Sequence, residues 1–205
     1  SGNDANVAAL GEMWQGGGKG YRDIVMITLG TGVGGGVILN QKMVSGAHGL
    51  AGEIGHIHVR DEEQEHCNCG GMGCLEQVAS ATGIAREARR TMASCDTPSL
   101  LREYGDRVTA KNVLDAAKAG DALADQVVEV VCRYLGLALA QASMMMDPEI
   151  FVIGGGVSKA GQYLIDRIYG HYDYFTPISK NKAKIGLATL GNDAGIYGAA
   201  RLILE

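Results

Sequence analysis

One histidine and three cysteines are the residues whose types and spacing point most directly to chemistry. His56 precedes the run Cys67-x-Cys69-x4-Cys74. Thiolate sulfur and imidazole nitrogen are the ligands that tetrahedral Zn²⁺ prefers, and the glycines between the cysteines allow the sharp turns that would bring the thiols together. Three cysteines and one histidine leave no open coordination position, so the pattern predicts a structural zinc site.

Two alternatives to this assignment stay open at the level of sequence. His48, His58 and His66 lie near the same run, so any of them competes with His56 for the fourth position. Three unrelated buried thiols are the alternative to a metal site.

Two glycine-rich segments could approach phosphate groups through their backbone amides. Gly30-Thr31-Gly32-Val33-Gly34-Gly35-Gly36 forms the first, and Gly154-Gly155-Gly156 the second. Residues without side chains let amides come close to an anion, and the Thr31 hydroxyl adds a donor. A tight hairpin would use the same glycines, and the Gly-Lys-Ser/Thr ending of a P-loop is absent. The spacing around residues 154–156 does not match a dinucleotide fingerprint.

A polar set could bind a substrate, although residue chemistry alone does not connect its members. The set comprises Asn3, Asp4, Glu53, His56 and Glu76. Asp4 is most simply the N-cap of a helix, and Glu53 and Glu76 are most simply exposed loop charges.

Alternating strand and helix patterns are expected to position these groups. Residues 24–39 predict two strands joined at the glycine-rich turn, and residues 150–153 predict a short buried strand. Apolar spacing predicts a helix over 81–94, ended by Pro98, and a long one over 121–146. A helix over 162–169, a strand over 184–190 and a helix over 193–204 complete an α/β chain. We expect one domain over residues 1–205, with residues 46–80 forming inserted loops.

Composition excludes several classes of protein. The chain has 205 residues, 46% of them hydrophobic, with 31 Gly, 3 Pro and a net charge of -5. That balance argues against disorder, collagen, and a nucleic-acid or anionic-membrane surface. No run of 18 consecutive apolar residues and no leader pattern is present, so we expect no membrane partner and a cytoplasmic location. Because a helix begins at residues 3–6 with no strand before it, we expect a preceding domain to be missing, and Ser1-Gly2 to be an expression remnant.

Four ordered motifs resemble the ROK family of repressors, open reading frames and sugar kinases. They are Asn3-Asp4-Ala5-Asn6, Leu29 to Gly36, Gly52-Glu53-Ile54-Gly55-His56, and Cys67-Asn68-Cys69-Gly70 to Gly73-Cys74-Leu75-Glu76. Within the family, they are most similar to those of bacterial ATP-dependent glucokinases. The resemblance extends from residue 3 to the C-terminus.

The resemblance implies roles for individual residues. Asp4 corresponds to the catalytic base that takes the proton from the attacking sugar hydroxyl, and Asn3 to a ligand of a sugar hydroxyl. Glu53, His56 and Glu76 correspond to residues that bind the other hydroxyls, and His56 also to the fourth zinc ligand. The phosphate and nucleotide contacts correspond to Gly30, Thr31, Gly32, Gly34 and Gly35, and to Gly154, Gly155 and Gly156.

The resemblance also implies an architecture and a reaction. The expected fold is the large C-terminal domain of an actin-like, ribonuclease-H-like ATPase with an inserted zinc-binding loop. The expected reaction is phosphorylation of glucose by ATP with Mg²⁺, in a homodimer. The family's small N-terminal domain with its Asp-x-Gly-Gly-Thr segment is absent, so the chain alone is expected to be inactive. The alternatives are a sugar-sensing repressor domain, or a kinase for fructose, mannose, N-acetylmannosamine or N-acetylglucosamine.

Overall fold

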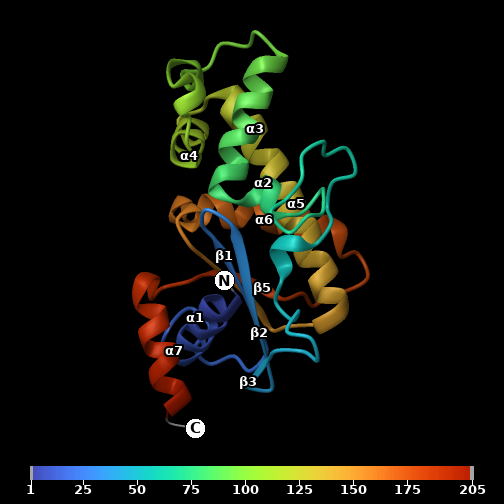
Figure 1. Cartoon of the computed structure of the whole chain (residues 1–205), viewed down its shortest axis with the longest axis vertical. Helices are drawn as coiled ribbons and strands as arrows, with labels where there is room; N and C mark the ends of the chain where they lie inside the picture. The colour runs from blue at the N-terminus through green and yellow to red at the C-terminus, as the bar shows by residue number, and fades with distance from the viewer. Residues whose placement is uncertain (1, 204–205) are drawn as a thin grey trace.

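A five-stranded mixed sheet forms the centre of the fold (Figure 1). The computed structural model describes residues 2–203, with side chains from Ala5 onward. The strands lie in the order β3-β2-β1-β4-β5. Their bounds are β1 Ile24–Leu29, β2 Val33–Leu39, β3 Lys42–Val44, β4 Ile150–Gly154 and β5 Lys184–Leu187. The first three strands are antiparallel, whereas β4 runs parallel to β1 and β5 parallel to β4. This is the strand order of a ribonuclease-H-like sheet.

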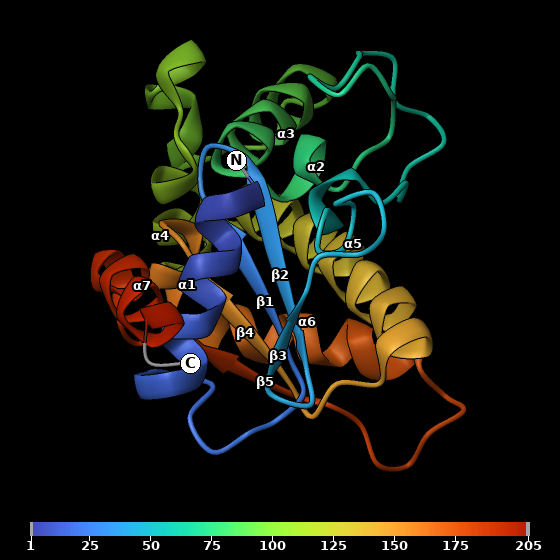
Figure 2. The ribbon, with the colours of Figure 1, turned by 60° about the horizontal axis from the view of Figure 1, so that its bottom comes forward.

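Helices cover both faces of the sheet (Figure 2). Helix α1, with α7 packed on it, lies on one face, and α5 and α6 lie on the other, together with the smaller helices that follow the inserted loops. The bounds are α1 Gly2–Gln15, α2 Glu76–Ala79, α3 Ala81–Ser94, α4 Ala110–Lys118, α5 Ala122–Met146, α6 Gln162–Phe175 and α7 Ala194–Ile203.

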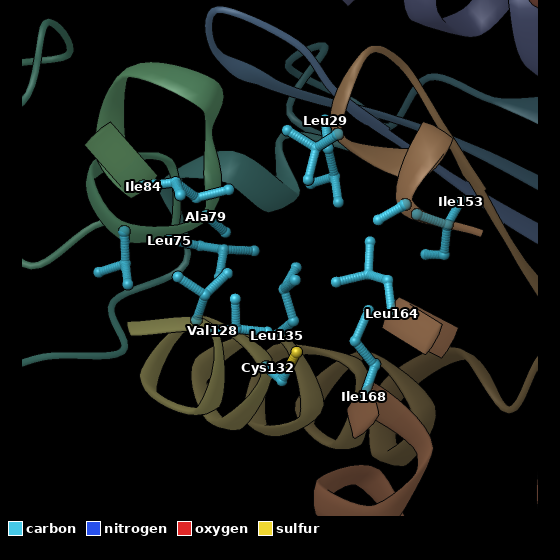
Figure 3. Close-up of a cluster of buried hydrophobic side chains, with 14 of the residues drawn as sticks. Leu29, Leu75, Ala79, Ile84, Val128, Cys132, Leu135, Ile153, Leu164 and Ile168 are labelled. Carbon is cyan, nitrogen blue, oxygen red and sulfur yellow. The ribbon is translucent and has the colours of Figure 1, made fainter. Parts of the chain in front are cut away.

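Alternation of apolar residues along the strands divides the core into two. Val25, Ile27 and Leu29 of β1 face the larger core, where they meet helices α2 to α6. Figure 3 shows Leu29 in this core with side chains of α2, α3, α5 and α6. Ile24 and Met26 of the same strand face a smaller core under α1. Successive strand residues point to opposite faces, so one short strand supplies both cores.

Helix α5 is long and apolar enough to cross a membrane by length and composition. Of the most apolar stretch of 18 residues in this helix, 56% is buried inside the protein. Its Val128, Cys132 and Leu135 lie in the larger core (Figure 3), so α5 has the environment of a core helix.

Most of the predicted elements are confirmed, with corrections to their bounds. Helix α6 continues to Phe175 and β5 stops at Leu187, whereas α3 has the predicted bounds, Ala81–Ser94. Helix α4 and strand β3 were not predicted. The N-cap assignment for Asp4 is wrong, because α1 begins at Gly2 and Asp4 lies inside its first turn.

The glycine-rich turn is shorter than the sequence predicts. Only residues 30–32 form it, whereas Gly34, Gly35 and Gly36 belong to β2 and pair with Thr28, Ile27 and Met26 of β1. The reason is close packing against α1. A Cβ on Gly36 would lie 2.8 Å from the Cβ of Ala9, so a side chain there would push the helix off the sheet.

Candidate functional site

His56 and the three clustered cysteines converge in space. Their ligand atoms all lie within 4.8 Å of one another. Cys67 Sγ is 3.7 Å from His56 Nδ1, and Cys69 Sγ is 3.6 Å from Cys74 Sγ. A tetrahedral zinc with bonds of about 2.3 Å to sulfur needs neighbouring sulfurs about 3.8 Å apart. The donor types and their spacing therefore fit a zinc ion.

The four side chains differ in burial, and burial changes the pKa values of the thiols. Cys67 and Cys74 are buried, while His56 and Cys69 are exposed. Burial raises the pKa of Cys67 and that of Cys74, the latter to about 12, because a buried thiolate loses its hydration. A divalent cation at the cluster would favour the thiolates by direct coordination.

Backbone hydrogen bonds hold the cysteine loop against the residues that follow His56. The amide of Val59 donates to the carbonyl of Gly73 at 2.8 Å, and the amide of Leu75 donates to Ile57 at 2.9 Å. The other histidines lie outside the cluster. His58, for instance, faces Asp61 at 2.8 Å.

An ionic cluster attaches the acidic part of this loop to α3. The carboxylate of Glu63 is fully buried and is bound by Arg86 at 3.0 Å and by Arg90 at 2.8 Å. The Arg90 guanidinium, which donates to the Glu63 carboxylate, lowers the pKa of Glu63 to about 2. Arg60 and Glu87 extend the cluster with a contact of 2.8 Å. Because each of these buried charges has a partner of opposite charge, the cluster gives the loop a defined position.

Three predicted substrate ligands meet in one cavity. Glu53, His56 and Glu76 line a cavity of about 330 Å³ beside the glycine turn. The remaining lining residues come from α1, β1, the glycine turn, β2 and the loop after β4: Ala5, Ala8, Thr28, Gly30, Thr31, Gly32, Val33, Gly34, Gly35 and Gly155. The cavity therefore collects polar groups from the inserted loop and backbone amides from the turn.

Glu76 connects the cavity to both the turn and the cluster. It is the first residue of α2, and its Oε2 accepts a hydrogen bond from the amide of Val33 at 2.9 Å. Its Oε1 lies 3.8 Å from Cys67 Sγ. On the other side of the cavity, Glu53 Oε2 is 3.9 Å from His56 Nε2. Neither the Glu53 carboxylate nor the Glu76 carboxylate is an isolated charge on a loop.

The side chains of Asn3 and Asp4 lie outside the described residues. Their backbone lies in the first turn of α1. Ala5 and Ala8, in the next turns of the same helix, line the cavity.

The loop after β4 borders two further cavities. Gly154, Gly155 and Gly156 line one of about 440 Å³, together with residues 187–189, 191 and 192 and with Glu12 of α1. Gly155 has a φ of +86°, and a Cβ there would lie 2.5 Å from the carbonyl oxygen of Leu29. The second cavity, of about 430 Å³, lies between this loop and α4.

Some residues of the site were missed by sequence reasoning. Arg86 and Arg90 lie one helical turn apart on α3, which is a spacing that could have indicated a partner for the acidic loop. Gln77 is buried, accepts from the amide of Cys74 and donates to the carbonyl of Glu65. The cavity beside α4 was missed because that helix was not predicted.

The strand order and the architecture define the class of protein as an α/β protein of the actin-like, ribonuclease-H-like ATPase fold. The ROK family pattern matches residues 1–205, and the chain belongs to the ROK family.

Known relatives agree with this assignment. The chain is 50% identical over 206 residues to a glucokinase of Halalkalibacterium halodurans. The matched residues cover 99% of this chain and 62% of the relative. It is 39% identical to a glucokinase of Thermotoga maritima, over 99% of this chain and 65% of that protein. A crystal structure of a ROK family glucokinase from Streptomyces griseus, in complex with glucose and AMPPNP, superimposes with a TM-score of 0.86 at 36% identity, covering 97% of this chain and 66% of the other. The chain thus spans about two thirds of the length of these proteins.

Proposed function

We propose that this chain is the major part of a hexose kinase that transfers the γ-phosphoryl group of ATP to glucose. The observation that carries the proposal is the cavity in which Glu53, His56 and Glu76 face the Gly30–Gly32 turn. Carboxylates and an imidazole suit the hydroxyls of a pyranose, and amides of a glycine turn suit a phosphate. The likeness to glucokinases supports glucose as the substrate.

Asp4 is the proposed general base. A carboxylate within reach of the acceptor hydroxyl would take its proton as the oxygen attacks phosphorus. Asn3 is proposed to hold a neighbouring hydroxyl. Both roles are supported by the position of α1, since Ala5 and Ala8 of this helix line the same cavity.

The cluster of His56, Cys67, Cys69 and Cys74 is the proposed zinc site. All four positions would be protein ligands, so the metal would hold the loop rather than act on the substrate. The loop would in turn present His56 and Glu76 to the sugar, because Glu76 follows Cys74 by two residues and starts α2.

ATP with Mg²⁺ is the proposed phosphoryl donor. The glycine turn would hold the phosphates, and Gly154, Gly155 and Gly156 would border the nucleoside. The cavity beside α4 supports this side of the site, because Leu114 and Val157 give it an apolar lining and Lys111 and Lys118 add cations. Mg²⁺ would be held mainly through phosphates and water.

The chain is proposed to be the large C-terminal domain of a longer cytoplasmic protein that forms homodimers. A small N-terminal domain would complete the phosphate site, and closure of the two domains would exclude water, which competes with the sugar for the phosphoryl group.

Calorimetry with a panel of hexoses tests the substrate. We expect the full-length protein to bind glucose more tightly than fructose, mannose or the N-acetyl sugars, and to phosphorylate it in a coupled assay. The 205-residue chain alone is expected to show no turnover. A preference for an N-acetyl sugar would contradict the choice of glucose.

A sugar-sensing repressor domain is the second candidate. Asp4 and the net charge of -5 favour the kinase, because a sensor needs no base and a DNA-binding surface needs clustered cations. Binding of the full-length protein to DNA, together with an absence of sugar phosphorylation, would decide for the repressor.

A further inference from the structure

Glu12 of α1 is a fully buried carboxylate that lies outside the sugar cavity. Its Oε2 accepts hydrogen bonds from the amides of Gly17 at 2.7 Å and Thr189 at 3.0 Å, and its Oε1 accepts one from Leu190 at 2.9 Å. Three backbone donors satisfy the charge, which would otherwise be costly at this depth.

The donors come from two segments that are distant in sequence. Gly17 belongs to the turn that follows α1, while Thr189 and Leu190 follow β5. Leu190 is the N-cap of the short helix Gly191–Asp193 that leads into α7, so the carboxylate fixes the two residues directly before that helix.

The carboxylate packs closely on the turn that follows α1, and Glu12 also lines the cavity of about 440 Å³ beside the loop after β4. A Cβ on Gly16 would lie 2.0 Å from Glu12 Oε2, so the turn packs directly on the oxygen. The carboxylate therefore has little freedom to move without displacing the turn or residues 189–190.

The helix that carries Glu12 and the segment that Glu12 binds border different parts of the proposed site. Asp4 and Glu12 are eight residues, about two turns, apart on α1, and Ala5 and Ala8 of the same helix line the sugar cavity. Residues 187–189, 191 and 192 line the cavity of about 440 Å³ that Gly154, Gly155 and Gly156 also line.

We propose that Glu12 is a positioning residue that couples the helix of the proposed base to the nucleotide side of the site. Its carboxylate holds residues 188–192 at a fixed distance from α1, so that the phosphoryl donor and Asp4 keep their relative placement. This inference rests on the proposed kinase function.

Glu12→Gln in the full-length protein tests the proposal. The amide keeps the shape of the side chain, but its NH₂ group would face a backbone N–H donor. We expect kcat to fall about tenfold or more and the Kd of AMPPNP to rise about fivefold or more, while the Kd of glucose stays within about twofold. Hydrogen exchange of the 188–192 amides should rise, with the β1 and β4 amides unchanged.

Glu149→Gln is the control for a carboxylate that makes the same type of contact at an exposed position. The Glu149 carboxylate also accepts from two backbone amides, those of Arg22 and Asp23, but at the opposite end of the sheet. We expect it to lower stability without changing either ligand affinity. If Glu12→Gln fails to fold, Gly16→Ala displaces the same carboxylate without changing its charge, and the same pattern is expected.

Two results would overturn the proposal: unchanged AMPPNP affinity and exchange, or an equal loss of both ligands with exchange raised throughout the chain. The second pattern would mean that Glu12 serves stability alone. If the wild type neither binds AMPPNP nor phosphorylates a hexose, the proposed function fails separately. Exchange at residues 188–192 then still decides whether Glu12 holds that segment.

Discussion

The side chain of Glu76 accepts a hydrogen bond from the backbone amide of Val33 at 2.9 Å, although the two residues are 43 positions apart. Val33 begins β2 directly after the glycine turn, and Glu76 begins α2 directly after the cysteine loop. One carboxylate therefore fixes the cysteine loop relative to the glycine turn. Displacing either segment would disturb both the proposed sugar contacts and the proposed phosphate contacts.

Glu76→Ala is expected to weaken sugar binding. The substitution removes a proposed hydroxyl ligand and leaves the Val33 amide without its acceptor. We expect the Kd of glucose, measured by calorimetry on the full-length protein, to rise about tenfold to a hundredfold. Glu62→Ala, which removes an exposed carboxylate from the neighbouring loop, serves as the control and should leave the Kd unchanged. Equal affinities for wild type and Glu76→Ala would remove Glu76 from the sugar site.

Asp4→Asn is expected to separate catalysis from binding. The amide keeps the size of the carboxylate but cannot accept the hydroxyl proton. We expect kcat in the full-length protein to fall about 10²-fold to 10⁴-fold, while the Kd of glucose changes by less than about threefold. A variant that retains most of its kcat would exclude Asp4 as the base.

Patterns that are local in sequence could be predicted, and the structure agrees with them. The hairpin of β1 and β2 follows from two runs of β-branched residues around glycines, and α5 follows from its apolar spacing. The convergence of Cys67, Cys69 and Cys74 follows from their short separation and the glycines between them. In each case the interacting residues lie close enough in the chain for spacing to limit their geometry.

Contacts between distant segments could not be predicted. Glu12 and Thr189 are 177 positions apart, and no local pattern marks either residue as a partner of the other. The predicted length of the glycine turn was wrong for the same reason. Gly34 and Gly36 are needed in β2 because α1 packs on them, and that packing depends on the tertiary fold rather than on the neighbouring residues.

Cys69→Ser is expected to release the metal and weaken sugar binding together. The substitution removes one of four ligands from a closed site. Metal analysis should show zinc falling from about one ion per chain to near none, with the Kd of glucose rising about tenfold or more. Cys95→Ser is the control, because Cys95 lies outside the cluster and contacts Thr91 on α3. Loss of zinc with unchanged glucose affinity would show that the metal does not organise the sugar site.

Acid is expected to weaken the ionic cluster that holds the cysteine loop. The hydrogen bond from Arg90 lowers the pKa of Glu63 to about 2 from its ordinary value of 4.5. A lowered pKa stabilises the fold above the unfolded-state value, and this contribution is lost as the pH falls from about 4.5 toward about 2. The shift corresponds to about 3 kcal/mol at neutral pH.

Denaturant unfolding of wild type and Glu63→Gln over this pH range tests the contribution. We expect the variant to be about 3 kcal/mol less stable at pH 7, and the difference to shrink toward zero near pH 2. Glu62→Gln, at the exposed neighbouring position, should follow the wild type throughout. A stability difference that does not depend on pH would mean that packing, rather than charge, accounts for the role of Glu63.

Gly155→Ala is expected to weaken nucleotide binding. Gly155 has a φ of +86°, and a Cβ would lie 2.5 Å from the carbonyl oxygen of Leu29, so the loop after β4 would have to move away from β1. Because this loop borders the proposed nucleotide site, we expect the Kd of AMPPNP to rise about tenfold, with the Kd of glucose within about twofold of wild type. Gly161→Ala is a matched control, since Gly161 has a φ of +74° but open space where its Cβ would lie. Both variants carry the backbone strain of a positive φ, and only Gly155→Ala adds the clash with Leu29. Equal losses of AMPPNP affinity in the two variants would assign the effect to strain, and would argue against close contact between the nucleotide and the loop after β4.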